Sequence, residues 1–204
     1  MASEPVFPET IETLRMVLRR YNCEDAPGIL ELVGQNRALL IREFPQMAKE
    51  LLNLEEVKSF TEEKLQQWNA RKTFCYGIWR KAAKEQIGQI QVKNIAWEIS
   101  SAELGYFIGS SWQRQGYASE SISAILRLTF QQLEFQRIFL RILPSNRESF
   151  SLAKKLGFQE EGLHRKAFRC GFGELHDVHY LALTREDYPL GNRSFSSDIK
   201  HLPK

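Results

Sequence analysis

The segment 113–118 places a glycine-bearing turn between a strand-like run, Glu103 to Ile108, and an amphipathic helix pattern that begins near Ser119. Its residues are Gln113, Arg114, Gln115, Gly116, Tyr117 and Ala118. This order predicts an anion site, because the first helical turn leaves backbone N–H groups unpaired at the positive end of the helix dipole. Gly116 and the small Ala118 let a phosphate approach the main chain. A turn that uses its glycine only for conformation has the same pattern.

The residues that follow supply the context that an anion-binding turn requires. Apolar side chains keep helical spacing at Ile122, Ile125, Leu126, Phe130 and Leu133. A second unit comes later in the chain, and it consists of Asn146 to Ser149, Ala153, and Leu156 to Phe158. The two units in this order resemble the acetyl-CoA-binding core of the GNAT superfamily of N-acetyltransferases. In this resemblance, 113–118 is the pyrophosphate loop and 146–158 is the second cofactor-contacting segment.

The resemblance extends over most of the chain. Thr13 to Arg19, followed by Asp25 and Ala26, is similar to the opening strand and first helix of the branch that contains ribosomal-protein serine and alanine N-terminal acetyltransferases. Further segments similar to this branch are Arg42 to Pro45, Trp68, Phe74 and Gly77 to Trp79. The resemblance implies an acyltransferase with acetyl-CoA as co-substrate.

The element pattern predicts one α/β domain with a mixed, mostly antiparallel sheet of about seven strands flanked by helices. Strands are expected at 14–19, 74–79, 86–92, 97–100, 103–108, 137–143, 162–169 and 177–183. Asp25 is expected to cap a first helix, and residues 36–57 are expected to be helical in pieces around Pro45. Ser59 and Glu62 form a capping-box pattern for a helix through Trp68.

A helix separates the strand 103–108 from the strand 137–143, so these two strands should run parallel. The resemblance implies that they splay apart, and that the pantetheine arm of CoA pairs with the open backbone near Phe107 and Ile108. Ser145 and Glu148 suggest a capping box for the next helix, which should end at Gly157.

Composition sets the remaining limits. The chain has 204 residues, of which 43% are hydrophobic, and lacks an internal linker, so residues 10–188 are expected to form one domain between tails at 1–9 and 189–204. No segment has the length of a membrane span, and the N-terminus is unlike a secretory signal, which predicts a cytoplasmic protein with no membrane partner. The net charge of +3 is too small to predict nucleic-acid binding.

The ligand-type residues do not predict a metal site. Cys23, Cys75 and Cys170 lie far apart in sequence without Cys-x-x-Cys spacing, so we expect free thiols. His176 and His179 lie three residues apart in a predicted strand, and such residues face opposite sides of the sheet.

Transfer of an acetyl group to an amine needs a neutral nitrogen, donors for the developing oxyanion and a proton for the departing thiolate. Backbone N–H groups of the strand 103–108 are the expected oxyanion donors. Many GNAT proteins have a tyrosine as proton donor where this chain has Ala153. The resemblance assigns that role to Ser149, one turn earlier, although a serine in a first helical turn can also satisfy a backbone N–H. It assigns Asn146 to the pantetheine amide, although an asparagine there can simply cap the helix.

Glu103 is the predicted base, because it opens the strand 103–108 and shares a face with Gly105 and Phe107. An exposed glutamate at a strand end is the alternative. Some members of the branch have a carboxylate where this chain has Phe168, so Glu160, Glu161 and His164 remain further candidates for the base.

Three functions fit the sequence. The first is acetylation of the N-terminal amine of a protein, including a ribosomal one, and the second is acetylation of a small amine such as a polyamine, an antibiotic or a toxin. The third is a non-catalytic CoA-binding protein. Homodimers occur in the resembling branch, so a homodimer is a further possibility.

Overall fold

The computed structural model describes residues 6–189. The strands are β1 Thr10–Glu12, β2 Met16–Arg20, β3 Phe74–Arg80, β4 Gln86–Ala96, β5 Ser101–Ile108, β6 Arg137–Ile142, β7 Gln159–Arg169 and β8 Leu175–Thr184. The helices are α1 Ala26–Gln35, α2 Arg37–Glu43, α3 Pro45–Glu50, α4 Leu54–Asn69, α5 Tyr117–Arg127 and α6 Arg147–Lys155. Each helix in this part of the chain is too short or too polar to span a lipid bilayer.

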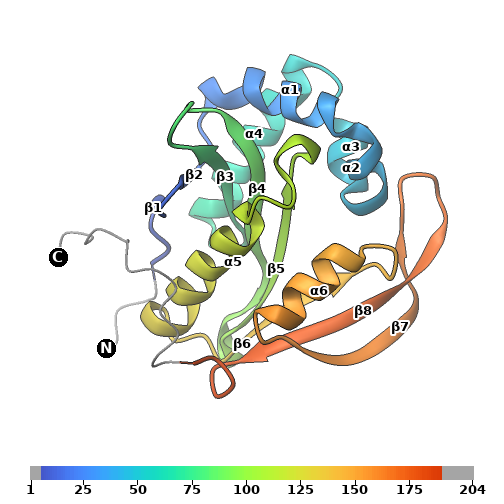
Figure 1. The fold of residues 1–204 in the computed structure, drawn as a ribbon. Helices are drawn as coiled ribbons and strands as arrows, with labels where there is room; N and C mark the ends of the chain where they lie inside the picture. The colour runs from blue at the N-terminus through green and yellow to red at the C-terminus, as the bar shows by residue number, and fades with distance from the viewer. Residues whose placement is uncertain (1–5, 190–204) are drawn as a thin grey trace.

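The strands form one eight-stranded open sheet in the order β1-β2-β3-β4-β5-β6-β8-β7 (Figure 1). Only the β5–β6 neighbours are parallel, because the α5 crossover separates them. The predicted single, mostly antiparallel α/β domain is confirmed. The strand that the sequence did not predict is β1, which is three residues long and therefore too short to show an alternating pattern.

The sheet opens between β5 and β6. These strands pair only at Ser101, Ala102 and Glu103 of β5. Beyond Glu103 the edge of β5 that faces β6 has no strand partner within residues 6–189, whereas its other edge stays paired with β4 as far as Ile108. The predicted splay is therefore present.

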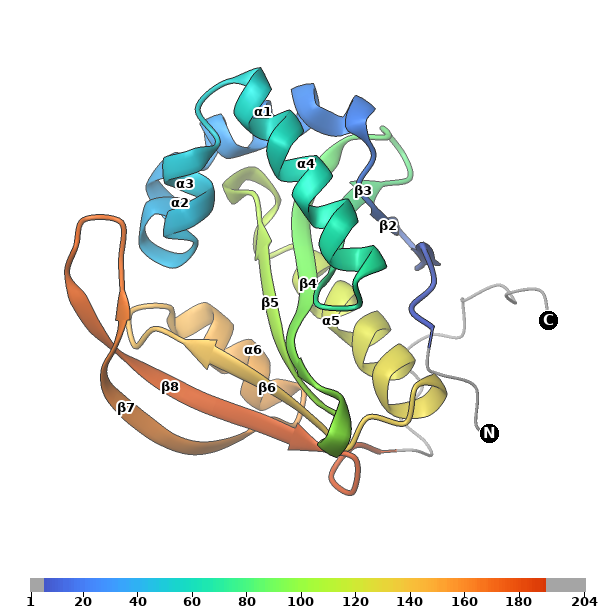
Figure 2. The same ribbon diagram turned by 180° about the vertical axis from the view of Figure 1, so that it is seen from behind.

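Helices cover both faces of the sheet. Figure 1 shows α5 and α6 in front of the strands, and Figure 2, from behind, shows α1 and α4 on the opposite face. The larger apolar core lies around α5 and includes Ile122, Ile125 and Phe130. A second core joins α1 to α4 with Phe107 of β5, so this strand is fixed from both sides.

Two predicted helix caps are wrong. Asp25 makes no capping hydrogen bond to α1, because its carboxylate is bound to Arg19, at 2.6 and 2.8 Å, and accepts from the Asn22 N–H. Ser59 lies inside α4, whose capping box is formed by Asn53 and Glu56.

Two further predictions are wrong in the middle and later parts of the chain. The expected strand 97–100 is a 3₁₀ turn, Trp97–Ile99, with Ser100 at φ 49°, and it lets β4 turn back into β5. Asn146, and not Ser145, caps α6. The expected end of this helix at Gly157 is confirmed by its φ of 99°.

Part of the predicted N-terminal tail belongs to the core. Phe7 is buried and stacks on Phe74 with ring centroids 3.8 Å apart. Burial of a phenylalanine contributes about 1.5–3 kcal/mol, which explains why this residue packs. The predicted C-terminal tail, 189–204, lies outside the described residues except for residue 189.

Candidate active site

The turn before α5 presents its main chain to solvent. Gly116 is the N-cap of α5 with φ 84°, a left-handed conformation that favours glycine, and no described side chain caps the helix. The first N–H groups of α5 are consequently available to an anion.

Arg15 fixes this turn through contacts with three of its neighbours. Arg15 donates its Nε–H to Glu120 at 2.7 Å and its Nη1–H to the Gln115 carbonyl at 2.9 Å. Its guanidinium also lies over the Tyr117 ring, 4.4 Å from the centroid. These contacts tie the turn to the residue that precedes β2.

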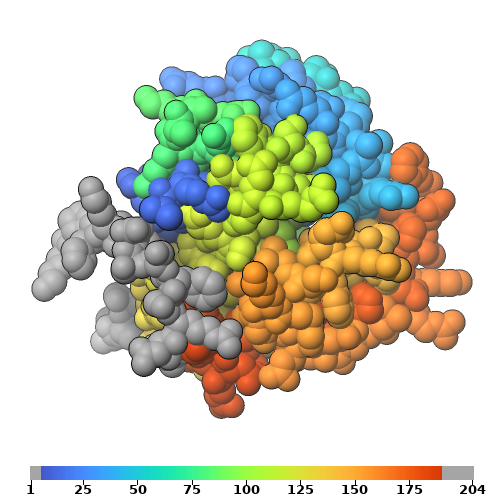
Figure 3. Space-filling model, viewed as in Figure 1, coloured from blue at the N-terminus to red at the C-terminus, as the bar shows by residue number. Residues whose placement is uncertain are grey.

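A cleft of about 590 Å³ runs from this turn to α6. In Figure 3 the segment leading into α5 (yellow-green) and the α6 segment (orange) form its two sides. The predicted cofactor residues that line the cleft are Phe107, Ile108, Gln113, Arg114, Gly116, Tyr117, Ala118, Asn146 and Ser149. The structure therefore brings both sequence units to one cavity.

Two glutamines have local structural roles. Gln115 does not line the cleft, since its side chain donates to the Ser111 carbonyl. Gln113 lines the cleft but donates to the Ile108 carbonyl at 3.0 Å, so this carbonyl already has a partner. Open pairing positions on β5 consequently lie before Ile108.

Asn146 joins two elements. Its Oδ1 accepts from the Ser149 N–H at 3.0 Å, which is the capping alternative considered from the sequence. Its Nδ2 donates to Glu43 Oε2 at 2.7 Å, and so links α6 to the end of α2. The predicted contact of Asn146 with pantetheine stays a prediction.

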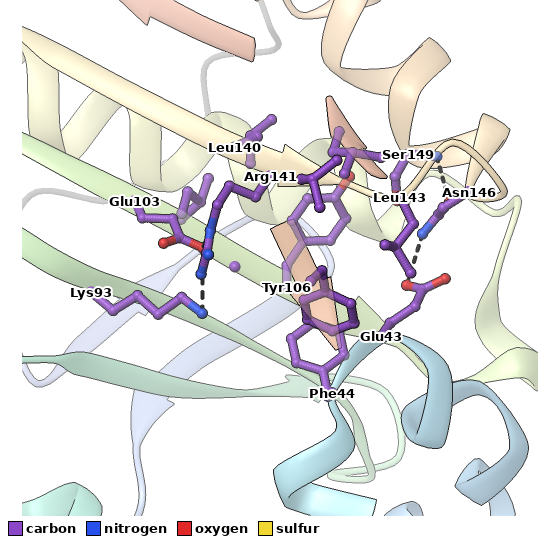
Figure 4. Close-up of a pocket in the computed structure, with 15 residues that line it drawn as sticks. Glu43, Phe44, Lys93, Glu103, Tyr106, Leu140, Arg141, Leu143, Asn146 and Ser149 are labelled. Carbon is purple, nitrogen blue, oxygen red and sulfur yellow. Dashed lines mark hydrogen bonds and ion pairs between the residues drawn. The ribbon is translucent and has the colours of Figure 1, made fainter. Parts of the chain in front are cut away.

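A second cavity, of about 100 Å³, lies where β5 and β6 separate (Figure 4). Its walls come from α2, β4, β5, β6, β7, β8 and the start of α6. Glu43, Tyr106, Asn146 and Ser149 line both cavities. The two cavities therefore meet at these four residues.

Glu103 is buried at one end of the second cavity, not exposed at a strand end. Its Oε2 accepts from Asn94 at 2.6 Å, and its Oε1 accepts from Arg141 at 3.0 Å. Lys93 Nζ lies 3.4 Å from the same Oε1. Figure 4 shows this cluster apart from Glu43 and Asn146.

Tyr106 and Glu43 are site residues that the sequence analysis did not identify. The Tyr106 hydroxyl is buried without a hydrogen-bond partner of good geometry among the described residues. Burial raises the pKa of Tyr106 to about 12, and the nearby Ser149 side chain acts in the opposite direction. The one available signal was the branch-like segment 42–45, which contains Glu43.

The alternative base candidates lie outside both cavities. Glu160 contacts His179 Nδ1 at 2.7 Å, and Glu161 pairs with Arg137. His164 stacks on Tyr180 with ring centroids 3.8 Å apart. None of the three lines either cavity.

The two histidines of β8 have different partners, since His179 contacts Glu160 whereas His176 contacts Glu174. Within residues 6–189, Cys170, Glu174 and His176 have ligand-type atoms within 4.8 Å of one another, at the β7–β8 hairpin. All three cysteines are free, and Cys75 and Cys170 are buried. The expected absence of a metal stays a prediction.

The structure thus combines an open strand edge, an uncapped helix N-terminus and a cleft between them. The sequence profile of the family described as "Acetyltransferase (GNAT) domain" matches residues 15–159. The chain belongs to the GNAT acetyltransferase family.

Relatives agree with this assignment. The uncharacterised N-acetyltransferase YoaA of Bacillus subtilis is 30% identical over 161 residues, which cover 79% of this chain and 88% of that protein. The ribosomal protein uS5-alanine N-acetyltransferase of Escherichia coli is 31% identical over 119 residues, covering 58% of this chain and 61% of that protein.

The fold has close structural neighbours. RimL, a ribosomal L7/L12 α-N-protein acetyltransferase solved in complex with coenzyme A, superposes with a TM-score of 0.78 at 23% identity, over 86% of this chain and 98% of that one. The microcin C7 self-immunity acetyltransferase MccE, solved with acetyl-CoA and AMP, gives 0.79 at 20% identity, over 88% and 98%.

This GNAT protein is therefore an N-acetyltransferase that uses acetyl-CoA. The residues of the cleft fit that co-substrate, because the uncapped α5 terminus suits a pyrophosphate and the open edge of β5 suits an amide-bearing arm. When bound, acetyl-CoA supplies the acetyl group as a thioester. The main chain at Arg114 and at 116–118 would hold its phosphates, and Ser149 lies where the two cavities meet.

Proposed function

We propose that this enzyme acetylates the N-terminal α-amine of a protein, and that a ribosomal protein is the acceptor. The observation that carries the proposal is the second cavity, which is only about 100 Å³ and meets the cofactor cleft at Glu43 and Ser149. A cavity of this size suits a small first residue such as alanine or serine. The carboxylates of Glu43 and Glu103 in its wall suit an ammonium group.

The chemistry of the amine also favours an N-terminus. With a reference pKa of about 7.8 for an α-amine and about 10.4 for lysine, roughly a third of the α-amine but only about 0.1% of the lysine is neutral near pH 7.5. That difference corresponds to about 3.5 kcal/mol. A site whose buried Glu103 is already bound to three donors suits the more acidic ammonium.

The relatives support the same acceptor class. The matching uS5 enzyme acts on an alanine of a ribosomal protein, and RimL acts on an α-amine of L7/L12. In the proposed reaction Ser149 donates a proton to the departing thiolate, as the family resemblance implies.

The test is a substrate panel followed by thiol release from acetyl-CoA. We expect turnover of peptides that begin with alanine or serine, and little turnover of the same peptides when their N-terminus is blocked. Sub-millimolar turnover of a polyamine, with none of the peptides, would reject the N-terminal acceptor. Retained acetyl-CoA affinity with no thiol release for any amine would indicate a non-catalytic CoA-binding protein.

A further inference from the structure

Glu43 carries the one carboxylate among the four residues that line both cavities. It is the last residue of α2 and lines both the cofactor cleft and the second cavity. Figure 4 shows it facing Asn146, with Tyr106 and Phe44 between it and the Glu103 cluster. Glu103, in contrast, lines only the second cavity.

The Glu43 carboxylate is available for a proton. Its Oε2 accepts from Asn146 at 2.7 Å, and its Oε1 has no hydrogen-bond partner within residues 6–189. It also forms no ion pair with any lysine or arginine in that range, whereas Glu103 contacts both Lys93 and Arg141. A carboxylate held by one neutral amide binds a proton more readily than one held by two cations.

The surroundings of Glu43 raise the pKa of its carboxyl on balance. Burial raises the pKa of the Glu43 carboxyl above its usual range, the Asn146 hydrogen bond opposes this rise, and Glu148 of α6 adds to it. Arg42, on the same helix, lowers it. The other titratable side chains that line the two cavities are Lys93, Glu103, Tyr106, Arg114, Tyr117, Arg141 and Lys155.

We propose that Glu43 is the general base that accepts the proton released by the substrate amine. The inference rests on the proposed acetyl transfer. The amine nitrogen forms the C–N bond with the acetyl carbon, and the C–S bond breaks with its electron pair on sulfur. The nitrogen loses its proton to Glu43 Oε1, and Glu43 returns this proton to solvent. The thiolate takes a proton from water or from Ser149, which regains its proton from solvent, and Asn146 positions the Glu43 carboxylate through its hydrogen bond.

The test compares Glu43→Gln with Glu103→Gln, and uses Glu50→Gln, an exposed residue at the end of α3, as the matched control. Thiol release is measured against pH with the best amine of the panel. We expect kcat of Glu43→Gln to fall about 10²- to 10⁴-fold while its acetyl-CoA affinity is retained. The acidic limb of the wild-type kcat profile should disappear in this variant, and should persist in Glu103→Gln and Glu50→Gln.

A second readout does not depend on any acceptor. The Glu43 carboxyl is titrated by ¹³C NMR, with its resonance assigned by its loss in Glu43→Gln. We expect a pKa above the reference value of about 4.3 for glutamate. A titration at or below that value overturns the proposal, as does an unchanged pH limb in Glu43→Gln. A rise in KM with unchanged kcat would make Glu43 a binding residue and also overturn it.

These outcomes are separable from failure of the proposed function. If wild-type protein acetylates only polyamines, the N-terminal acceptor is rejected, but the pH profile with the polyamine still tests Glu43. If no amine is acetylated, both the proposed function and the catalytic role of Glu43 are rejected. If Glu103→Gln alone loses the acidic limb, the base is Glu103, as the sequence predicts.

Discussion

The cofactor cleft differs in construction from the second cavity, which is called the acceptor cavity below because the substrate amine is proposed to bind there. One side of the cleft is largely a continuous segment, 107–119, whose main chain faces the ligand at an uncapped helix terminus. The acceptor cavity is assembled from side chains of seven separate elements. Cofactor binding should therefore be lost by blocking a single turn. Acceptor chemistry should depend on individual side chains such as Glu43 and Ser149.

Blocking the turn is expected to have the largest effect. Gly116→Glu places a side chain and a negative charge at the α5 terminus, on a backbone with φ 84°. A Cβ there would also lie 3.2 Å from Arg15 Nη2. We expect calorimetry to detect no acetyl-CoA binding to the folded variant.

The matched control for this variant is Gly173→Glu. Gly173 has φ 89°, so it imposes the same kind of backbone strain, but it lies in the exposed β7–β8 hairpin with open space around it. It should bind acetyl-CoA as the wild type does. Unchanged affinity of Gly116→Glu would remove the turn from the cofactor site.

A smaller effect is expected at the serine where the two cavities meet. Ser149→Ala removes the predicted proton donor but leaves the backbone N–H that Asn146 caps, so α6 should remain intact. We expect kcat to fall about 10²-fold with little change in acetyl-CoA affinity, measured by steady-state kinetics and calorimetry. Ser151→Ala, an exposed neighbour on α6, is the control. Equal rates for both variants would assign Ser149 a structural role only.

Replacing each of the two carboxylates of the acceptor cavity should change the stability of the protein differently. Glu103→Gln leaves Lys93 and Arg141 without their buried anion, so we expect the free energy of unfolding to fall by about 2 kcal/mol. Urea denaturation at neutral pH measures this change. A variant as stable as wild type would show that the Glu103 cluster contributes nothing to the fold.

Glu43→Gln should have the smallest effect on stability, and of opposite sign. The folded-state pKa of Glu43 is raised, so ionising this carboxyl disfavours the folded state above that pKa. The variant should therefore melt slightly higher than wild type at neutral pH. The difference should vanish below the unfolded-state pKa of glutamate, which a pH series of thermal melts would show. A lower melting temperature at neutral pH would contradict the raised pKa.

The local sequence predicted most of the elements that line the cofactor cleft. Gly116, the strand before it and the amphipathic α5 are neighbours in the chain, so their spacing contains the geometry. The crossover predicted that β5 and β6 run parallel, and the family resemblance implied that they splay apart; both are observed, with pairing that ends at Glu103. Gln115 was the exception, because only the fold shows that its side chain turns back to Ser111.

The side chains of the acceptor cavity were much less predictable, because they come from segments far apart in the sequence. Glu43 meets Asn146 across 103 residues of sequence, and no local pattern contains that contact. For Glu103 the sequence left open a general base or an exposed strand end, and only the fold shows that its partners from β4 and β6 bury it. Sequence identified the chemistry required in the cavity, but tertiary packing decides which carboxylate is free to perform it.

A crystal structure of the protein with bound CoA tests the central claim most directly. The account predicts its pyrophosphate on the backbone N–H groups of Arg114 and of 116–118, its pantetheine arm along β5, and its sulfur near Ser149 between the two cavities. CoA bound elsewhere, or with its sulfur directed away from Ser149 and Glu43, would contradict the account.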